Sequence, residues 1–140
     1  MKLNKNFQPQ PTEEGEELFP NGLFEFNITK LLAFITANAS KFPMEQVEVS
    51  QFAVWDSTNL DEKTIETADL ANPIILGEIS PDCFNVIDGN HRLERARRQG
   101  LATIPAYRVA AAHHVNFLKT KVAYEGYIRY WNSKVEDWEP

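Results

Sequence analysis

Residues 85–100 read Asn-Val-Ile-Asp-Gly-Asn-His-Arg-Leu-Glu-Arg-Ala-Arg-Arg-Gln-Gly. A short apolar run stops at Asp88-Gly89, and a helical pattern begins at once and ends near Gly100. The stretch therefore predicts a strand, a tight turn and a helix over about 90–99. Because the first turn of a helix presents unpaired N–H groups and the positive end of the peptide dipole, this junction is suited to an anion, most often a phosphate.

The segments on either side of this stretch predict a small sheet. Apolar runs at 73–76 and 83–87 flank a turn region at 77–82, which indicates a β-hairpin. A further β-type run follows the helix at 104–109. An imperfectly alternating run rich in β-branched residues predicts another strand over 47–54.

Helices are predicted around these strands. Asn27 precedes an apolar stripe and is a good N-cap for a helix of about three turns. The polar segment 60–70 is expected to contain a short helix. Toward the C-terminus, apolar and aromatic residues recur at helical spacing, which predicts one or two amphipathic helices over 112–138, interrupted or bent near Gly126. The element order indicates a single α+β domain, with a small mixed sheet, packed helices and an added C-terminal helical segment.

The composition restricts the class of protein. The chain has 140 residues, of which 43% are hydrophobic, and a net charge of −6. DNA binding is not expected, because a nucleic-acid binder usually carries a basic face that neutralises phosphates. Cys83 is the only cysteine, which excludes an internal disulfide and suits a reducing compartment. With neither a signal-peptide pattern nor a membrane-spanning apolar run, the expected location is the cytoplasm.

The first 18 residues differ from the rest of the chain. They are polar and contain four glutamates and two prolines. We expect residues 1–18 to form a flexible acidic arm and residues 19–140 to form the single domain. An acidic arm that docks on a partner is the alternative interpretation.

The predicted turn concentrates side chains that suit phosphate. Gly89 permits a tight turn and the close approach of an anion. Asn90 can donate through its amide, Arg92 offers a planar fork of donors, and His91 can donate to a phosphoryl oxygen or carry a proton. Asp88 can hold Mg²⁺ through one oxygen and leave room for nucleotide phosphates and water.

Two further arginines, Arg95 and Arg98, follow on the same predicted helix and add positive charge. An acidic protein thus carries one dense basic region beside a helix start. A purely structural interpretation is also open, in which Asp88 caps the helix and Arg92 and Arg95 form surface ion pairs. The context of strand, turn and helix favours the anion site.

Three segments together resemble the ParB/sulfiredoxin-like domain family. They lie at 73–76, 84–96 and 100–107, and they follow one another as strand, G-x-x-R turn, helix, glycine and Ile-Pro strand, which is the order in that family. The resemblance covers about residues 47–109. It implies a single ParB/sulfiredoxin-like domain with that core, to which the helices over 112–138 are added.

The resemblance also implies a nucleotide site. In this family the turn and the start of the helix hold the phosphates of a nucleotide, usually with Mg²⁺. Carried over to this chain, the phosphate ligands would be Gly89, Asn90, His91 and Arg92, with Arg95 beside them. The nucleotides to expect are ATP, ADP or CTP.

Members of the family differ in their chemistry. Sulfiredoxins have a cysteine directly before the His-Arg pair, where this chain has Asn90, so sulfinic-acid repair is not expected. Chromosome-partition ParB proteins bind CTP and add a DNA-binding helix-turn-helix domain downstream, for which this chain ends too soon. A free-serine kinase branch carries Asp-Gly-His-His-Arg, to which residues 88–92 are similar. That branch uses an acidic residue after the first strand as a base, and Asp56 is nearest to that place here.

Two functions are therefore predicted. The first is a nucleotide-binding enzyme, either a Mg-dependent phosphotransferase or an NTPase, in which Asp56 orients an acceptor hydroxyl and His91 carries a proton. The alternative is a non-enzymatic protein-binding module, antitoxin-like, immunity-like or regulatory, whose partner contacts the aromatic C-terminal helices.

Overall fold

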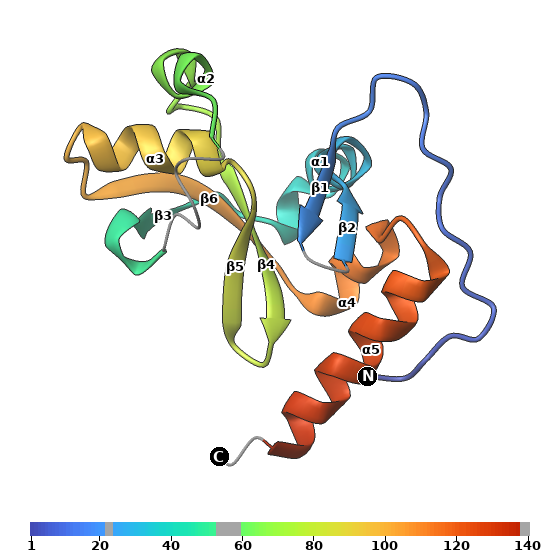
Figure 1. The fold of residues 1–140 in the computed structure, drawn as a ribbon. Helices are drawn as coiled ribbons and strands as arrows, with labels where there is room; N and C mark the ends of the chain where they lie inside the picture. The colour runs from blue at the N-terminus through green and yellow to red at the C-terminus, as the bar shows by residue number, and fades with distance from the viewer. Residues whose placement is uncertain (22–23, 53–59, 138–140) are drawn as a thin grey trace.

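A computed structural model of the chain describes residues 1–21, 24–52 and 60–137 (Figure 1). The centre is a four-stranded sheet in the order β3-β6-β4-β5, in which β6 is parallel to β4 while β3–β6 and β4–β5 are antiparallel. A separate antiparallel ribbon joins β1 to β2. The strands are β1 (Leu18–Asn21), β2 (Phe24–Asn27), β3 (Glu45–Glu48), β4 (Ile74–Ser80), β5 (Cys83–Asp88) and β6 (Thr103–Val109). The predicted α+β fold with a small mixed sheet is confirmed.

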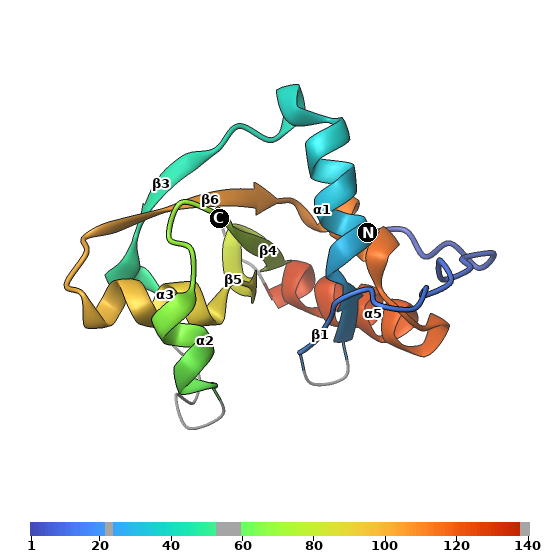
Figure 2. The same cartoon turned by 90° about the horizontal axis from the view of Figure 1, so that it is seen from above.

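The helices gather on the two faces of the central sheet. The α-helices are α1 (Ile28–Ala37), α2 (Glu62–Thr67), α3 (Asn90–Arg98), α4 (Ala111–His114) and α5 (Lys121–Asp137), and the 3₁₀ turns are η1 (Ala39–Lys41), η2 (Val49–Gln51) and η4 (Val115–Phe117). Seen from above, α2 and α3 lie together at one side of the molecule and α1 and α5 at the other (Figure 2). None of the helices in the described part of the chain is long and apolar enough to cross a membrane.

The sheet is buried on both faces because its middle strands alternate between two apolar cores. Ile74 and Leu76 of β4 pack in one core with Leu93 of α3. Ile75, between them, lies in the other core, together with Leu31 of α1 and Tyr127 of α5. A strand buried on both sides needs a continuous apolar run rather than an alternating one, which accounts for the sequence Ile-Ile-Leu at the start of β4.

Two helices begin at side-chain caps, of which the sequence predicts the one at Asn27. The side chain of Asn27 accepts a hydrogen bond from the backbone N–H of Lys30 at 3.0 Å and caps α1. Asp61 caps α2 in the same way, accepting from the N–H of Thr64 at 3.1 Å. The buried stripe of α1 consists of Ile28, Leu31 and Ile35.

The strand predicted over 47–54 is wrong in its extent within the described residues, and its last two positions, 53–54, lie outside them. β3 begins at Glu45 and ends at Glu48, and the chain continues into η2. The N–H of Val49 donates to the carbonyl of Ala102 at 3.0 Å, and the Val49 side chain enters the core beneath α3. These tertiary contacts turn the chain away from β6.

The turn predicted over 77–82 is also shorter in the structure. β4 continues to Ser80, and only Pro81 and Asp82 connect it to β5, with Asp82 at a φ of 59°. Gly77 stays in the strand, where an added Cβ would lie 3.1 Å from the side chain of Ile87. This glycine therefore serves close packing and does not mark the turn.

The interruption predicted near Gly126 is wrong, because α5 runs through this residue. The break falls earlier, where Leu118 pairs with Phe26 of β2 and the N–H of Lys119 donates to a carbonyl of the same strand at 2.8 Å. Pairing with β2 ends the preceding helical turn. The hydroxyl of Thr120 then accepts a backbone N–H at the start of α5.

The N-terminal segment contacts the domain at both of its ends. The Phe7 ring is buried and stacks on Tyr124 of α5, with ring centroids 3.9 Å apart. Near the other end, the Glu16 carboxylate lies 3.8 Å from the ammonium group of Lys30 on α1. The flexibility of this segment in solution and the domain boundary at residue 18 stay predictions.

Candidate functional site

The turn between β5 and α3 is built on a glycine that no other residue can replace without strain. Gly89 has a φ of 106°, in the left-handed region, and is the N-cap of α3. An added Cβ would lie 2.5 Å from Cγ2 of Ile74 and 3.0 Å from Nη2 of Arg92. The bond from the N–H of Leu93 to the carbonyl of Gly89, 2.9 Å long, closes the first helical turn. The predicted strand, tight turn and helix start are confirmed.

A bulge in β5 precedes this turn. Asp88 pairs with Ile75 of β4, whereas Leu76 pairs with Val86, so Ile87 is an extra residue in β5. A bulge bends its strand and redirects the side chains beyond it. It fixes the direction in which Asp88 leaves the sheet.

Among the described residues, no side chain caps the first turn of α3. The N-cap is a glycine without a side-chain hydrogen bond, and the first turn contains no acidic residue. The backbone N–H groups of Asn90, His91 and Arg92 precede the first helical bond, so they have no helical carbonyl to bind. The interpretation in which Asp88 caps the helix is therefore wrong.

Asn90 carries a polar atom without a partner at the same place. Its Oδ1 is buried and, among the described residues, finds no hydrogen-bond partner. The amide can be turned over with little change in shape, so either its oxygen or its NH₂ group can occupy this position. A buried polar group without a partner costs free energy, and a ligand or a water molecule that binds it removes that cost.

Arg92 is held by its neighbours. Its Nη2 donates to Oδ2 of Asp88 at 3.0 Å, and its Nη1 lies 3.0 Å from the carbonyl of Pro73 and 3.3 Å from that of Asn72. These bonds tie the turn to the segment before β4. The predicted ion pair of Arg92 is confirmed, and its guanidinium is not a free fork of donors.

The other arginines of α3 also form hydrogen bonds with neighbouring groups. Nη1 of Arg95 donates to the carbonyl of Ala68 at 2.6 Å. The buried carboxylate of Glu94 accepts from Nε of Arg97 and from Nε of Arg98, each at 2.9 Å. These hydrogen bonds, that of Arg97 first, hold the pKa of Glu94 below its usual value against the opposing effect of burial. The basic region is therefore largely balanced by its own neighbours.

His91 joins the turn to α2. Its Nε2 accepts a hydrogen bond from the backbone N–H of Asp61 at 3.2 Å. Since Nε2 accepts, the neutral ring carries its proton on Nδ1. Asp56, the predicted base, lies outside the described residues.

Glu17 belongs to this site, although the sequence gives no signal for it. Glu17 and Asp88 line one cavity of about 570 Å³ between α1 and the end of β5. Partial burial, and after it the carboxylate of Asp88, raise the pKa of Glu17, while Arg92 and His91 act in the opposite direction. The charges of Asp88, Arg92 and His91 thus act on Glu17, which places the N-terminal segment beside the predicted site.

The described residues contain no group of three His, Cys, Asp or Glu side chains that could hold a metal ion by themselves. Mg²⁺ commonly binds to one or two carboxylates and completes its shell with phosphate oxygens and water. Asp88 supplies one carboxylate of this kind, and Mg²⁺ at Asp88 stays a prediction.

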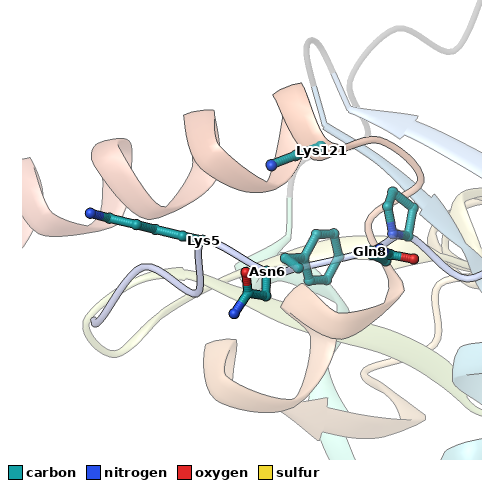
Figure 3. Close-up of a pocket in the computed structure, with 6 residues that line it drawn as sticks. Lys5, Asn6, Gln8 and Lys121 are labelled. Atoms are coloured by element: carbon teal, nitrogen blue, oxygen red, sulfur yellow. The ribbon is translucent and has the colours of Figure 1, made fainter.

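A second cavity, of about 390 Å³, lies away from the turn (Figure 3). It is formed by residues 5–9 of the N-terminal segment and by Lys121 at the start of α5. None of the predicted site residues belongs to it.

The aromatic residues of the C-terminal helix serve mainly as core. Tyr124 and Tyr127 are buried, and Trp131 packs against the same core. The more exposed apolar side chains of α5 are Val122, Tyr130 and Val135. A protein partner on this helix stays a prediction.

Comparison with known proteins gives one match. A family model described as ParB N-terminal domain matches residues 35–120, which is more than half of the chain. No curated protein and no solved structure matches. The matched residues include β3 to β6, α2 and α3, and thus the whole turn, whereas Glu17 and all of α5 lie outside them.

Proposed function

The chain belongs to the ParB N-terminal domain family, and on this basis we propose that it binds a nucleotide at the turn between β5 and α3. The phosphates would lie over the first turn of α3. The observation that carries the proposal is the start of α3, which no side chain of the described residues caps and beside which Oδ1 of Asn90 is buried without a partner among those residues.

The backbone supplies most of the phosphate ligands in this proposal. Three N–H groups, at residues 90–92, point out of the helix end, and the helix dipole adds positive potential there. Gly89 has no Cβ between the phosphate and these groups. The Asn90 amide adds a donor when its NH₂ group faces the ligand. Arg92, held by Asp88, contributes charge from a fixed position.

The charges around the turn support a dependence on Mg²⁺. Asp88 and Glu17 are negative and Arg92 is positive, so the immediate surroundings of the turn are not cationic. A di- or triphosphate brings several more negative charges. Mg²⁺ bound to Asp88 would supply the missing positive charge and reduce the charge repulsion.

The activity that we propose for this site is that of a Mg-dependent phosphotransferase or an NTPase. Phosphoryl transfer depends mostly on positioning and on the neutralisation of charge. His91, with a proton on Nδ1, would donate to a phosphoryl oxygen. Asp56 would orient the acceptor hydroxyl or the attacking water.

Titration calorimetry with ATP, ADP, CTP and GTP, each with Mg²⁺, tests the proposal. We expect one nucleotide to bind with a stoichiometry of one and to bind much more weakly in EDTA. Asn90→Ala should weaken binding about tenfold, which corresponds to one charge-assisted hydrogen bond. Asn85→Ala, the same change within β5, should leave the affinity unchanged.

Phosphate release, measured on the nucleotide that binds, tests the activity. Turnover by the wild-type protein is the expected result. If none of the four nucleotides binds in the presence of Mg²⁺, the proposal is wrong.

A further inference from the structure

The cavity beside the turn has one apolar side and one acidic end. Along α1 it is lined by Ile28, Thr29, Leu32, Ala33, Thr36 and Ala37, and at its end by Glu17 and Asp88. All of these α1 residues except Ile28 are exposed and recur at steps of three and four, so they form one open stripe on the helix. A volume of about 570 Å³ is in the range of small-molecule sites.

Glu17 is held in place by α1. Its backbone N–H donates to the hydroxyl of Thr29 at 2.7 Å, and its carbonyl accepts the N–H of Ile28 at 2.9 Å. The fold thus fixes the main chain of Glu17 at the end of the cavity. The Glu17 side chain therefore extends from a fixed main-chain position at the end of the cavity that Asp88 also lines.

The Glu17 carboxylate at the acidic end forms no ion pair of its own with the described residues, although Arg92 and His91 are near enough to act on it. Asp88 is paired with Arg92 at 3.0 Å. Lys30, the lysine of α1, lies within 4.0 Å of Glu13 and Glu16 instead. Within the described residues, no lysine or arginine forms an ion pair with Glu17. The raised pKa of Glu17, caused by partial burial and by Asp88, has the direction expected for such a charge.

We propose that this cavity binds a small aliphatic primary amine, with its ammonium group between Glu17 and Asp88 and its carbon chain along Leu32, Ala33 and Ala37. One positive charge makes the acidic end neutral. The apolar stripe shields a short alkyl chain from water. The site shares Asp88 with the proposed nucleotide site but lies along α1 and not over the start of α3, and amine binding does not require a nucleotide.

An NMR titration of the ¹⁵N-labelled full chain with n-hexylamine hydrochloride tests the proposal. We expect saturable shifts of backbone signals at Glu17, in α1 and at Asp88. Hexan-1-ol has the chain without the charge, and ammonium chloride has the charge without the chain. Each should bind at least about tenfold more weakly than hexylamine, because each lacks one of the two contacts.

Two pairs of variants separate the charged contact from the apolar one. Glu17→Gln should weaken hexylamine binding about threefold to fivefold, whereas Glu14→Gln, an exposed glutamate outside the cavity, should not change it. Leu32→Ser should weaken it severalfold, and Leu101→Ser should have no effect. Leu32 and Leu101 are both 41% exposed, so neither substitution removes a core residue.

A carbon-detected titration of the Glu17 carboxyl group supplies an independent readout. An ammonium group beside it stabilises the carboxylate, so saturating hexylamine should lower the pKa of Glu17. The proposal is overturned if hexan-1-ol produces the same shifts as hexylamine, if Glu17→Gln binds like the wild type, or if hexylamine produces no saturable shift.

Discussion

Within the described residues, Asn90 Oδ1 and His114 Nδ1 are both buried without a hydrogen-bond partner, and their surroundings are opposite. His114 is fully enclosed, with its ring 5.2 Å from the rings of both Phe26 and Tyr127. Asn90 is the first residue of α3 and is partly exposed. An unpaired atom that nothing can reach lowers stability, whereas one at an open helix end can be paired by a ligand.

A hydrogen bond made by its other ring nitrogen explains why His114 is tolerated in the core. Nε2 lies within hydrogen-bond distance of the carbonyl of Glu78, to which it donates, so Nδ1 carries a lone pair and no proton. Burial lowers the pKa of His114 to about 4, opposed by the hydrogen bond to Glu78. The ring is thus neutral, and its unpaired Nδ1 is enclosed in the core, out of reach of a ligand.

The largest loss of stability is expected from a substitution that deforms the turn at Gly89. In Gly89→Ala the new Cβ would meet Ile74 at 2.5 Å on a backbone with a φ of 106°. We expect a loss of about 3 kcal/mol in the free energy of unfolding, from strain and overpacking together. Urea denaturation measures this loss.

Gly100→Ala is the matched control for that change. Gly100 also has a positive φ, of 70°, but apart from its chain neighbours no described residue has a heavy atom within 4 Å of its added Cβ. It should cost only about 1 kcal/mol, the conformational term alone. Equal losses in the two variants would show that the contact with Ile74 is unimportant.

Lowering the pH should destabilise the protein through the enclosed His114. Because the pKa of His114 is about 4 in the folded protein and near its ordinary 6.5 in the unfolded chain, the unfolded state binds the extra proton between these values. Stability contributed by the neutral ring is complete above pH 6.5 and falls as the pH drops toward 4. Between pH 7 and pH 5 we expect a loss of about 2 kcal/mol in the free energy of unfolding.

Two histidine variants assign that loss, with urea denaturation at both pH values as the measurement. His114→Leu should remove this part of the pH dependence, since it has no imidazole to titrate. His113→Gln, at the adjacent and less buried position, should keep it. Retention of the full loss by His114→Leu contradicts the assignment.

Asn90 should matter least to stability. Its unpaired oxygen forms no bond that the folded protein would lose, so Asn90→Ala should change the free energy of unfolding by less than about 0.5 kcal/mol. Asn27→Ala removes the cap of α1 and should cost about 1 kcal/mol. A comparable cost at Asn90 would mean that its amide is structural.

Features of the fold that depend on neighbours in sequence could be predicted, and those that depend on distant contacts could not. The Asn27 cap and the helix that ends before Gly100 follow from local residue types. From the sequence, Gly77 suggests a turn. In the structure it lies in β4, where Ile87 packs against it across the hairpin. Likewise, the start of α5 is set by the pairing of Leu118 with β2.

The same division holds for the candidate site. Gly89, Asn90 and Arg92 are adjacent, so the strand, the turn and the helix start identify them together. Glu17 lies some seventy residues earlier in the chain and lines the same cavity as Asp88 only because the N-terminal segment packs on α1. The sequence also suggested more free positive charge than α3 has, because the acceptors of its arginines come partly from other elements, such as Ala68 and Glu62.

The most direct test of the nucleotide site compares the two ends of α3 by NMR. Titrating Mg²⁺ with ATP, and then with CTP, into the ¹⁵N-labelled protein should shift the backbone N–H signals of residues 89–92 and the side-chain amide of Asn90. The signals of residues 98–101, whose end of the helix is closed by backbone bonds at Gln99, Gly100 and Leu101, should hardly move. Shifts confined to that end, or to the cavity of Lys5 and Lys121, or no shifts with either nucleotide, would contradict the account.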